Sequence, residues 1–276
     1  MNVAEEAEAL ACAVSIYDYA SKTSWSYRGD RWFHAASTIK VAVLVGLFAR
    51  IDEGLLDLDN RLHVRNRFIG VHDRKAYRIS PSRDPNDAVH RAIGKLMRIR
   101  ELAHHMIATS SNLATNLLLD LVGVDVIRGA LERFGVSGID LRRGVEDEAA
   151  FEADINNRVT GDGLVSLFRL IEERRAFSDE AAQGMLDVLH RQEFRSGIPA
   201  GVPDDVRTET QFAHKTGDIS SVTHDAGIVY LPGRSPYVVA LLTEWNADSK
   251  NRRETVARLS RIVYDHLSEV ELEEHE

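Results

Sequence analysis

Residues 33–40 read Phe33-His34-Ala35-Ala36-Ser37-Thr38-Ile39-Lys40, and a dense apolar run follows them as far as Ile51. This run predicts a buried helix over residues 38–53. Ser37 stands at its start, where serine is a good cap, and Gly54 is well placed to end it. Because residues three apart on a helix share a face, the amine of Lys40 can approach the hydroxyl of Ser37.

This pairing suggests a chemical role for the segment. A serine hydroxyl becomes a good nucleophile only when a neighbour takes its proton, and a lysine can do so when burial or nearby cations lower its pKa. The start of a helix also supplies backbone N–H groups that stabilise an oxyanion. One Ser-x-x-Lys match is nevertheless expected about once by chance in a chain of this size. Alone, the motif is better explained as a helix cap beside a solvated lysine.

Two further elements follow in the order that such chemistry requires. Ser110-Ser111-Asn112 lies between two helical patterns, where its hydroxyl and amide can relay a proton and hold a substrate amide. Lys215-Thr216-Gly217 lies on a predicted strand, where lysine and threonine can bind a carboxylate and glycine allows close approach of a substrate backbone. Ser249-Lys250-Asn251 repeats the Ser-x-Asn form but follows the third element, so we assign it to the surface.

Strand patterns lie near both ends of the chain, with helical patterns between them. Strands are predicted at 10–19, 24–28, 212–215, 226–231 and 237–243, and helices within 95–136 and at 160–175, 178–190 and 252–269. This order predicts an α+β fold. We expect a sheet domain from residues 1–54 and 205–276 and a mostly helical domain from residues 55–204. The polar, basic stretch 63–94 is predicted to be a surface connection with a short helix at its end.

Bulk properties exclude several classes of protein. The net charge of −9 over 276 residues argues against a nucleic-acid partner. No stretch is apolar enough for a membrane span. No cysteine or histidine cluster indicates a metal, and we expect no cofactor. Cys12, the one cysteine, is expected to be a small buried hydrophobe. The acidic N-terminus predicts a cytoplasmic protein if Met1 is the native start, and a secreted or periplasmic one if a leader was removed.

The three elements and their flanking residues resemble the class A β-lactamase-like serine hydrolases, within the superfamily of serine β-lactamases and penicillin-binding proteins. The resemblance implies an antiparallel sheet flanked by helices, an all-α domain, and an active site between them. It implies an acyl-enzyme at Ser37, with Lys40 and Ser110 in catalysis. It also implies that the substrate, a small β-lactam or a peptide-like or ester-like acyl compound, is bound by Asn112, Lys215, Thr216 and Gly217. The backbone N–H groups of Ser37 and Asp218 would form the oxyanion hole.

The chain departs from that family in two places. Class A β-lactamases carry a deacylating glutamate in a Glu-x-x-Leu-Asn sequence, which is absent here. The family's spacing lands on Glu146, although a short insertion or deletion would move the role to Asp147 or Glu148, and an acidic surface loop is an equal alternative. The glutamate's asparagine partner falls on Ala150. Ser111 stands where the family usually has aspartate, so acidic support for the second element is expected to be missing.

These departures leave the substrate and the turnover open. The leading hypothesis is β-lactamase-type hydrolysis of a β-lactam amide, with fast and slow deacylation both left open. The alternatives are a related peptidase or esterase, and a non-catalytic binding module of the same fold.

Overall fold

A five-stranded antiparallel sheet joins the two ends of the chain. The computed structural model describes residues 2–274, with side chains for residues 3–268. The strand order is β10-β11-β12-β1-β2, and the N-terminal β1 pairs along its length with the C-terminal β12. The strands are β1 (Ala11–Asp18), β2 (Thr23–Tyr27), β10 (Gln211–Ile219), β11 (Val222–Tyr230) and β12 (Tyr237–Glu244). The predicted strands at 10–19 and 24–28 are confirmed as β1 and β2, which pair antiparallel.

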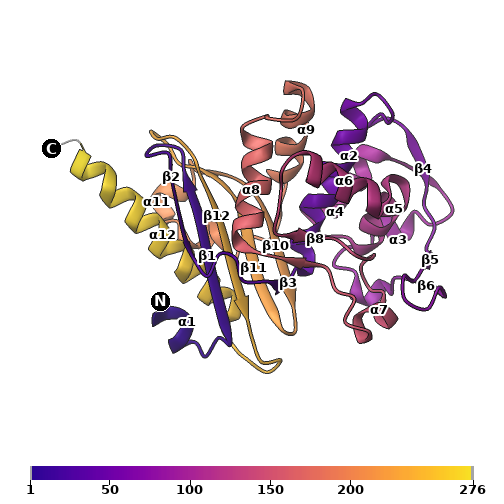
Figure 1. The fold of residues 1–276 in the computed structure, drawn as a ribbon, viewed down its shortest axis with the longest axis horizontal. Coiled ribbons are helices and arrows are strands. Elements are labelled where there is room, and N and C mark those ends of the chain that lie inside the picture. The colour runs from indigo at the N-terminus through magenta and orange to yellow at the C-terminus, as the bar shows by residue number, and fades with distance from the viewer. Residues whose placement is uncertain (1, 275–276) are drawn as a thin grey trace.

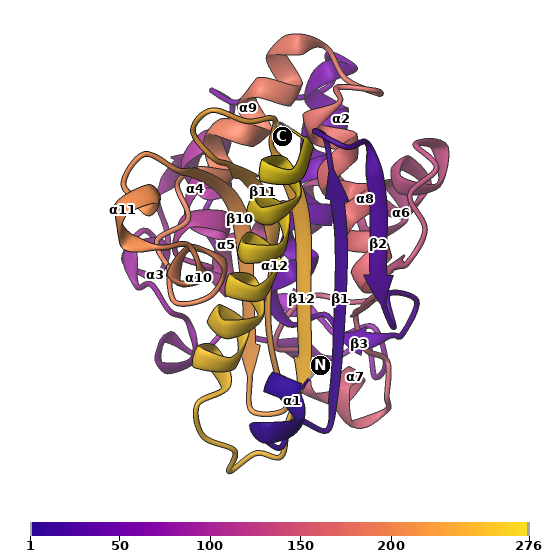
Figure 2. The same ribbon diagram turned by 90° about the vertical axis from the view of Figure 1, so that its left-hand side faces the viewer.

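Both faces of this sheet are covered by helices. Along β12, Val238, Ala240 and Leu242 contribute to one apolar cluster, and the alternating residues Tyr237, Val239 and Leu241 contribute to the other. This follows from the two-residue period of a strand, and it explains why β12 reads as a continuous apolar run. Helix α12 (Arg252–Glu274) crosses the outer face beside α1 (Asn2–Glu6), whereas α8 (Gly161–Glu172) packs on the inner face (Figures 1 and 2).

The remaining long helices gather on the inner side of the sheet (Figure 1). They are α2 (Lys40–Asp52), α4 (Ile99–Ala108), α5 (Asn112–Val122), α6 (Val124–Arg133) and α9 (Asp179–Leu189). Helix α2 packs against α5, α6 and α9, so the prediction of a buried helix is confirmed. Gly54 follows it with a φ of +71°, as the end of a helix favours. The prediction that Ser37 caps this helix is wrong, because Ser37 lies inside the 3-10 helix η1 (Ala36–Ile39) and makes no capping hydrogen bond.

Short elements complete the chain. Two small two-stranded sheets lie in the connection between α2 and α4, and a three-stranded sheet lies beside η1. The strands are β3 (Phe33–His34), β4 (Arg61–His63), β5 (Phe68–Ile69), β6 (Ala76–Tyr77), β7 (Leu96–Arg98), β8 (Ile139–Asp140) and β9 (Arg158–Val159). The helices are η2 (Pro81–Arg83), α3 (Ala88–Arg91), α7 (Glu148–Glu152), α10 (Ile198–Gly201) and α11 (Asp204–Arg207).

The predicted α+β architecture, an antiparallel sheet flanked by helices beside a helical region, is confirmed. The division into domains at residues 54 and 205 stays a prediction, and one apolar cluster includes residues from both proposed parts, among them Leu118 of α5 and Ala240 of β12. The short helix expected near residue 90 is present as α3. The description of residues 63–94 as a surface connection is wrong in one respect, since Asp84 is buried. None of the described helices has the length and apolarity that a membrane crossing requires.

Candidate active site

The segment around Ser37 makes a tight turn between β3 and α2. Ala36 has a φ of +45°, which places a non-glycine residue in the left-handed region. The turn is stabilised because Thr38 Oγ1 donates to the carbonyl of Ala35 at 2.6 Å and the Ala36 N–H donates to His34 Nδ1 at 3.0 Å. Ser37 itself is half-buried and so is not enclosed in the core.

The amine of Lys40 brings the first two elements together. Lys40 is fully buried, and its Nζ donates to Ser110 O at 2.6 Å, to Ser110 Oγ at 3.0 Å and to Asn112 Oδ1 at 2.9 Å. Burial lowers the pKa of Lys40 from 10.5 to about 7, although the carboxylates of Asp84 and Glu146 raise it. A substantial share of the amine is therefore neutral near pH 7 and can accept a proton.

The third element lies on β10, directly beside η1. A Cβ at Gly217 would lie 3.1 Å from Thr38 Cγ2 and 3.2 Å from the carbonyl oxygen of Ala35, so glycine is what allows the strand to approach the nucleophile segment. Lys215 is fully buried and donates from Nζ to Thr216 O at 2.9 Å. Burial lowers the pKa of Lys215 well below 10.5, and the neighbouring charge of Lys40 lowers it further. The structure thus brings the three predicted elements to one place.

Asp218 follows this element, and its side chain belongs to an ion-pair group. Its Oδ2 accepts from Arg253 Nε at 2.8 Å, and its Oδ1 lies 3.5 Å from Arg252 Nη2. The backbone of Asp218, to which the family resemblance assigns a part of the oxyanion hole, continues β10 beyond Gly217.

The three candidate acids of the loop point in different directions. Asp147 is buried and accepts from the N–H groups of Val71 and Ala150, so it caps α7. The side chain of Glu148 is 70% exposed and pairs with Arg83. Of the three, Glu146 faces the second element, with Oε1 3.4 Å from Asn112 Nδ2 and Oε2 2.7 Å from Arg83 Nε. Burial raises the pKa of Glu146, and the charge of Arg83 opposes that rise.

Sequence reasoning missed two residues that contact this group, and both belong to the stretch assigned to the surface. Asp84 accepts hydrogen bonds at the start of α5, from Ser111 Oγ at 3.1 Å and from the Leu113 N–H at 2.9 Å. Arg83 pairs with Glu146. The expectation that the second element lacks acidic support is therefore wrong, because the acid comes from another part of the chain. Serine at position 111, where an aspartate was expected, hinted that another acid supports the second element. Nothing in the sequence indicated that this acid is Asp84.

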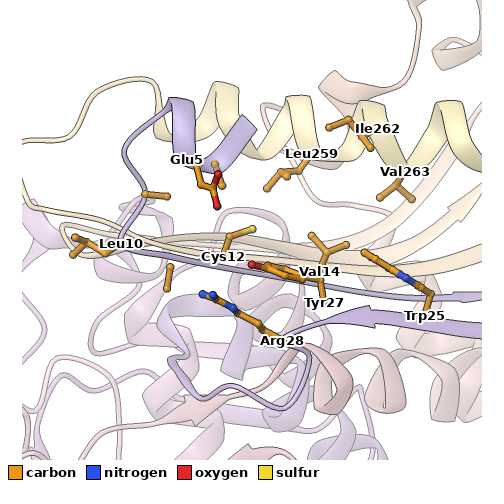
Figure 3. A pocket seen from close by; sticks show the side chains of 13 residues that line it. Glu5, Leu10, Cys12, Val14, Trp25, Tyr27, Arg28, Leu259, Ile262 and Val263 are labelled. Atoms are coloured by element: carbon orange, nitrogen blue, oxygen red, sulfur yellow. The ribbon is translucent and has the colours of Figure 1, made fainter. Parts of the chain in front are cut away.

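An apolar groove of about 250 Å³ lies elsewhere, on the outer side of the sheet (Figure 3). It is lined by residues of α1, β1, β2 and α12, including Cys12, Trp25 and Leu259, and by none of the predicted site residues. Cys12 is buried, as predicted, and burial raises its pKa to about 11. Its thiol is therefore protonated near neutral pH and is not an alternative nucleophile.

The chain belongs to the β-lactamase enzyme family, whose model matches residues 1–267. It is 28% identical over 184 residues to a β-lactamase of Bacteroides uniformis, an alignment that covers 60% of this chain and 59% of that protein. It is 27% identical over 261 residues to β-lactamase 1 of Streptomyces cacaoi, covering 88% of this chain and 75% of that one.

A solved structure extends this likeness to the fold. A mutant of PBP-A, whose structure is described as an acyl-enzyme complex with penicillin G, matches with a TM-score of 0.80 and 25% identity. The match covers 97% of each chain. The fold of this chain is thus that of the class A β-lactamases, as the three elements implied.

Proposed function

We propose that this protein is a serine hydrolase that forms an acyl-enzyme at Ser37 and opens the amide of β-lactams. One observation carries the proposal: the buried amine of Lys40, with its lowered pKa, contacts Ser110 and Asn112 immediately after the Ser37 turn. In the alternative interpretation of the motif, a helix cap beside a solvated lysine, the lysine would be exposed and would have an ordinary pKa. The family match and the fold support the same reaction class.

In acylation, neutral Lys40 accepts the hydroxyl proton while Ser37 Oγ bonds to the carbonyl carbon. The oxyanion that forms is stabilised by the backbone N–H groups of Ser37 and Asp218. When the carbon–nitrogen bond breaks, Ser110 gives its hydroxyl proton to the leaving nitrogen and takes a proton from the Lys40 ammonium, whose Nζ lies 3.0 Å from Ser110 Oγ. This leaves an ester at Ser37 and returns Lys40 to its neutral form. Asn112 binds the substrate's side-chain amide, and Lys215 and Thr216 bind its carboxylate beside Gly217.

In deacylation, Glu146 takes a proton from a water molecule as the water oxygen bonds to the ester carbonyl carbon. The bond from that carbon to Ser37 Oγ then breaks, and Ser37 Oγ receives the proton. The half-buried carboxylate of Glu146 beside Asn112 supports that role, and the capping contacts of Asp147 and the exposure of Glu148 favour it over its neighbours.

A second candidate function is that of a related peptidase or esterase that β-lactams merely acylate. Two features favour slow release of the acyl group. Ala150 stands where the family has the asparagine that partners the deacylating acid, and one oxygen of Glu146 is already paired with Arg83. The PBP-A structure, described as an acyl-enzyme complex with penicillin G, is a neighbour in which such an ester is present.

Nitrocefin turnover combined with mass spectrometry of the intact protein separates these functions. Hydrolysis of nitrocefin with a transient adduct on Ser37 is expected for a β-lactamase, whereas a stable adduct without turnover supports the second candidate. Ser37→Ala is the control and should carry no adduct. Lys40→Ala should remain folded by circular dichroism and lose acylation. Normal labelling of Lys40→Ala by a fluorescent penicillin would contradict its role as the base.

A further inference from the structure

Asp84 supplies a buried carboxylate to the start of α5 from a segment that lies 27 residues upstream of Ser111. Its side chain is fully buried, and its oxygens accept from Ser111 Oγ at 3.1 Å and from the N–H groups of Asn112 and Leu113 at 3.1 and 2.9 Å. His90 Nε2 lies 3.1 Å from the same carboxylate. The first N–H groups of a helix have no partner within the helix and attract negative charge, so a carboxylate there is stabilised and stabilises the helix start in turn.

The segment that Asp84 holds, Ser111–Leu113, includes Asn112, one of the two residues that bind the amine of Lys40. Ser110 precedes this segment with a φ of +58°, a left-handed conformation that a serine keeps only where its surroundings impose it. Ser110 O, Ser110 Oγ and Asn112 Oδ1 are the three acceptors of Lys40 Nζ. A shift of the Ser111–Leu113 backbone would therefore move the acceptors that orient the proposed base.

Arg83, the preceding residue, contacts the other half of the site. Its Nε lies 2.7 Å from Glu146 Oε2, and its carbonyl oxygen accepts from Asn112 Nδ2 at 3.1 Å. Glu146 has a φ of +60°, and residue 150, four positions further on, is an alanine, whose side chain can offer the carboxylate no hydrogen bond. Two consecutive residues thus contact both halves of the proposed site, Asp84 at the start of α5 and Arg83 at Glu146.

We propose that Arg83 and Asp84 form a positioning pair for the reaction, in which Asp84 acts through Ser110 and Lys40 on acylation and Arg83 acts through Glu146 on deacylation. The inference rests on the proposed function. It predicts that the two half-reactions can be impaired separately by changing adjacent residues.

The test measures both steps in the full-length protein. Acylation is followed by single-turnover labelling with a fluorescent penicillin, and deacylation by mass spectrometry of the isolated acyl-enzyme over time. Asp84→Asn should slow acylation at least about tenfold more than deacylation, because small displacements of catalytic groups cost rates of that order. Arg83→Gln should show the opposite pattern, with deacylation slowed at least about tenfold more than acylation.

Three further measurements separate positioning from general loss of structure. In the Asp84→Asn background, Ser111→Asp returns a carboxylate to the start of α5 and should restore most of the acylation rate. The pH inflection of acylation should move to lower pH in Asp84→Asn, because the carboxylate that favours the ammonium form of Lys40 is gone. Asp87→Asn and Arg91→Gln are matched controls, since these exposed residues pair with each other in the same region, and neither should change either rate.

The outcomes are distinct. If the unmodified protein is not acylated at Ser37, the proposed function fails. If it is acylated and both variants slow the same step equally, or if neither slows its step, the positioning pair is wrong. If Asp84→Asn does not fold, the comparison rests on Arg83→Gln, whose side chain is 54% exposed, and on the double variant with Ser111→Asp. Unequal effects in the stated directions support the inference.

Discussion

The pH dependence of acylation follows from the burial of Lys40. In solution a lysine is almost wholly protonated at neutral pH, but burial lowers the pKa of this one from 10.5 to about 7. The neutral amine is the form that can take the Ser37 proton. Because this form predominates above the pKa, acylation should be present above pH 7 and be lost as the pH falls through that value.

The size of the effect can be worked out from this pKa. The neutral fraction of Lys40 would be about 3% at pH 5.5 and about 97% at pH 8.5, so acylation should rise about 30-fold between them and then level off. A lysine with a pKa of 10.5 would instead give a rise of about tenfold per pH unit, or about 1,000-fold over the same range, without a plateau. The shape of the curve therefore distinguishes a buried base from a solvated one.

The assay is single-turnover labelling with a fluorescent penicillin across this pH range at constant ionic strength. It reports acylation alone, so titration of Glu146 in the later step does not contribute. Lys215 also has a lowered pKa, and Lys215→Arg is the control because arginine keeps its charge throughout. The inflection near pH 7 should survive in Lys215→Arg. A continuous rise without a plateau, or disappearance of the inflection in that variant, would refute the assignment to Lys40.

Two other predictions concern the loop acid and β10. Glu146→Gln should slow deacylation more than acylation, as measured by decay of the acyl-enzyme. Glu148→Gln is the control and should change neither rate, because the side chain of Glu148 is exposed. If only Glu148→Gln slows the decay, the deacylating acid is Glu148 and the assignment to Glu146 is wrong. Gly217→Ala should lower the acylation rate about tenfold with unchanged circular dichroism, because its Cβ would press on Thr38 and Ala35. Gly129→Ala, where a Cβ meets nothing within 4 Å, is its control, and equal labelling of the two variants would show that the contact is unimportant.

Local patterns are sufficient to predict the main elements of the fold. The apolar run after Lys40 predicts α2 because a helix surrounded by other helices is apolar on every side, and the strands are indicated by β-branched runs that end at glycine and proline. The turn at Ser37 is different. A serine before a helix suggests a cap, whereas here Ala36 enters the left-handed region and Ser37 continues as a 3-10 helix.

The site is predictable where chemistry is tied to a short motif, and not where it depends on distant contacts. Lys40, Asn112 and Lys215 belong to motifs whose order along the chain is itself informative. Asp84 belongs to none, since a carboxylate that reaches a helix start from 27 residues away leaves no periodic or spaced signal. The same holds for Asn116, which fixes the loop before Glu146 through both the N–H and the carbonyl of Val145.

Two features of the surroundings of Lys40 shift the pKa of its amine in opposite directions. Burial favours the neutral amine, whereas three acceptors and the carboxylates of Asp84 and Glu146 favour the ammonium form, and the pKa near 7 is the balance between them. Asp84 and Glu146 also both contact Asn112 of the second element. Asp84 accepts from the backbone N–H of Asn112, and Glu146 accepts from its side-chain amide. A residue that sets the position of the base therefore also sets its proton affinity. It follows that replacing either acid should change both the rate of acylation and the pH at which its inflection falls, so the two effects are separated by measuring the rate across the whole pH range.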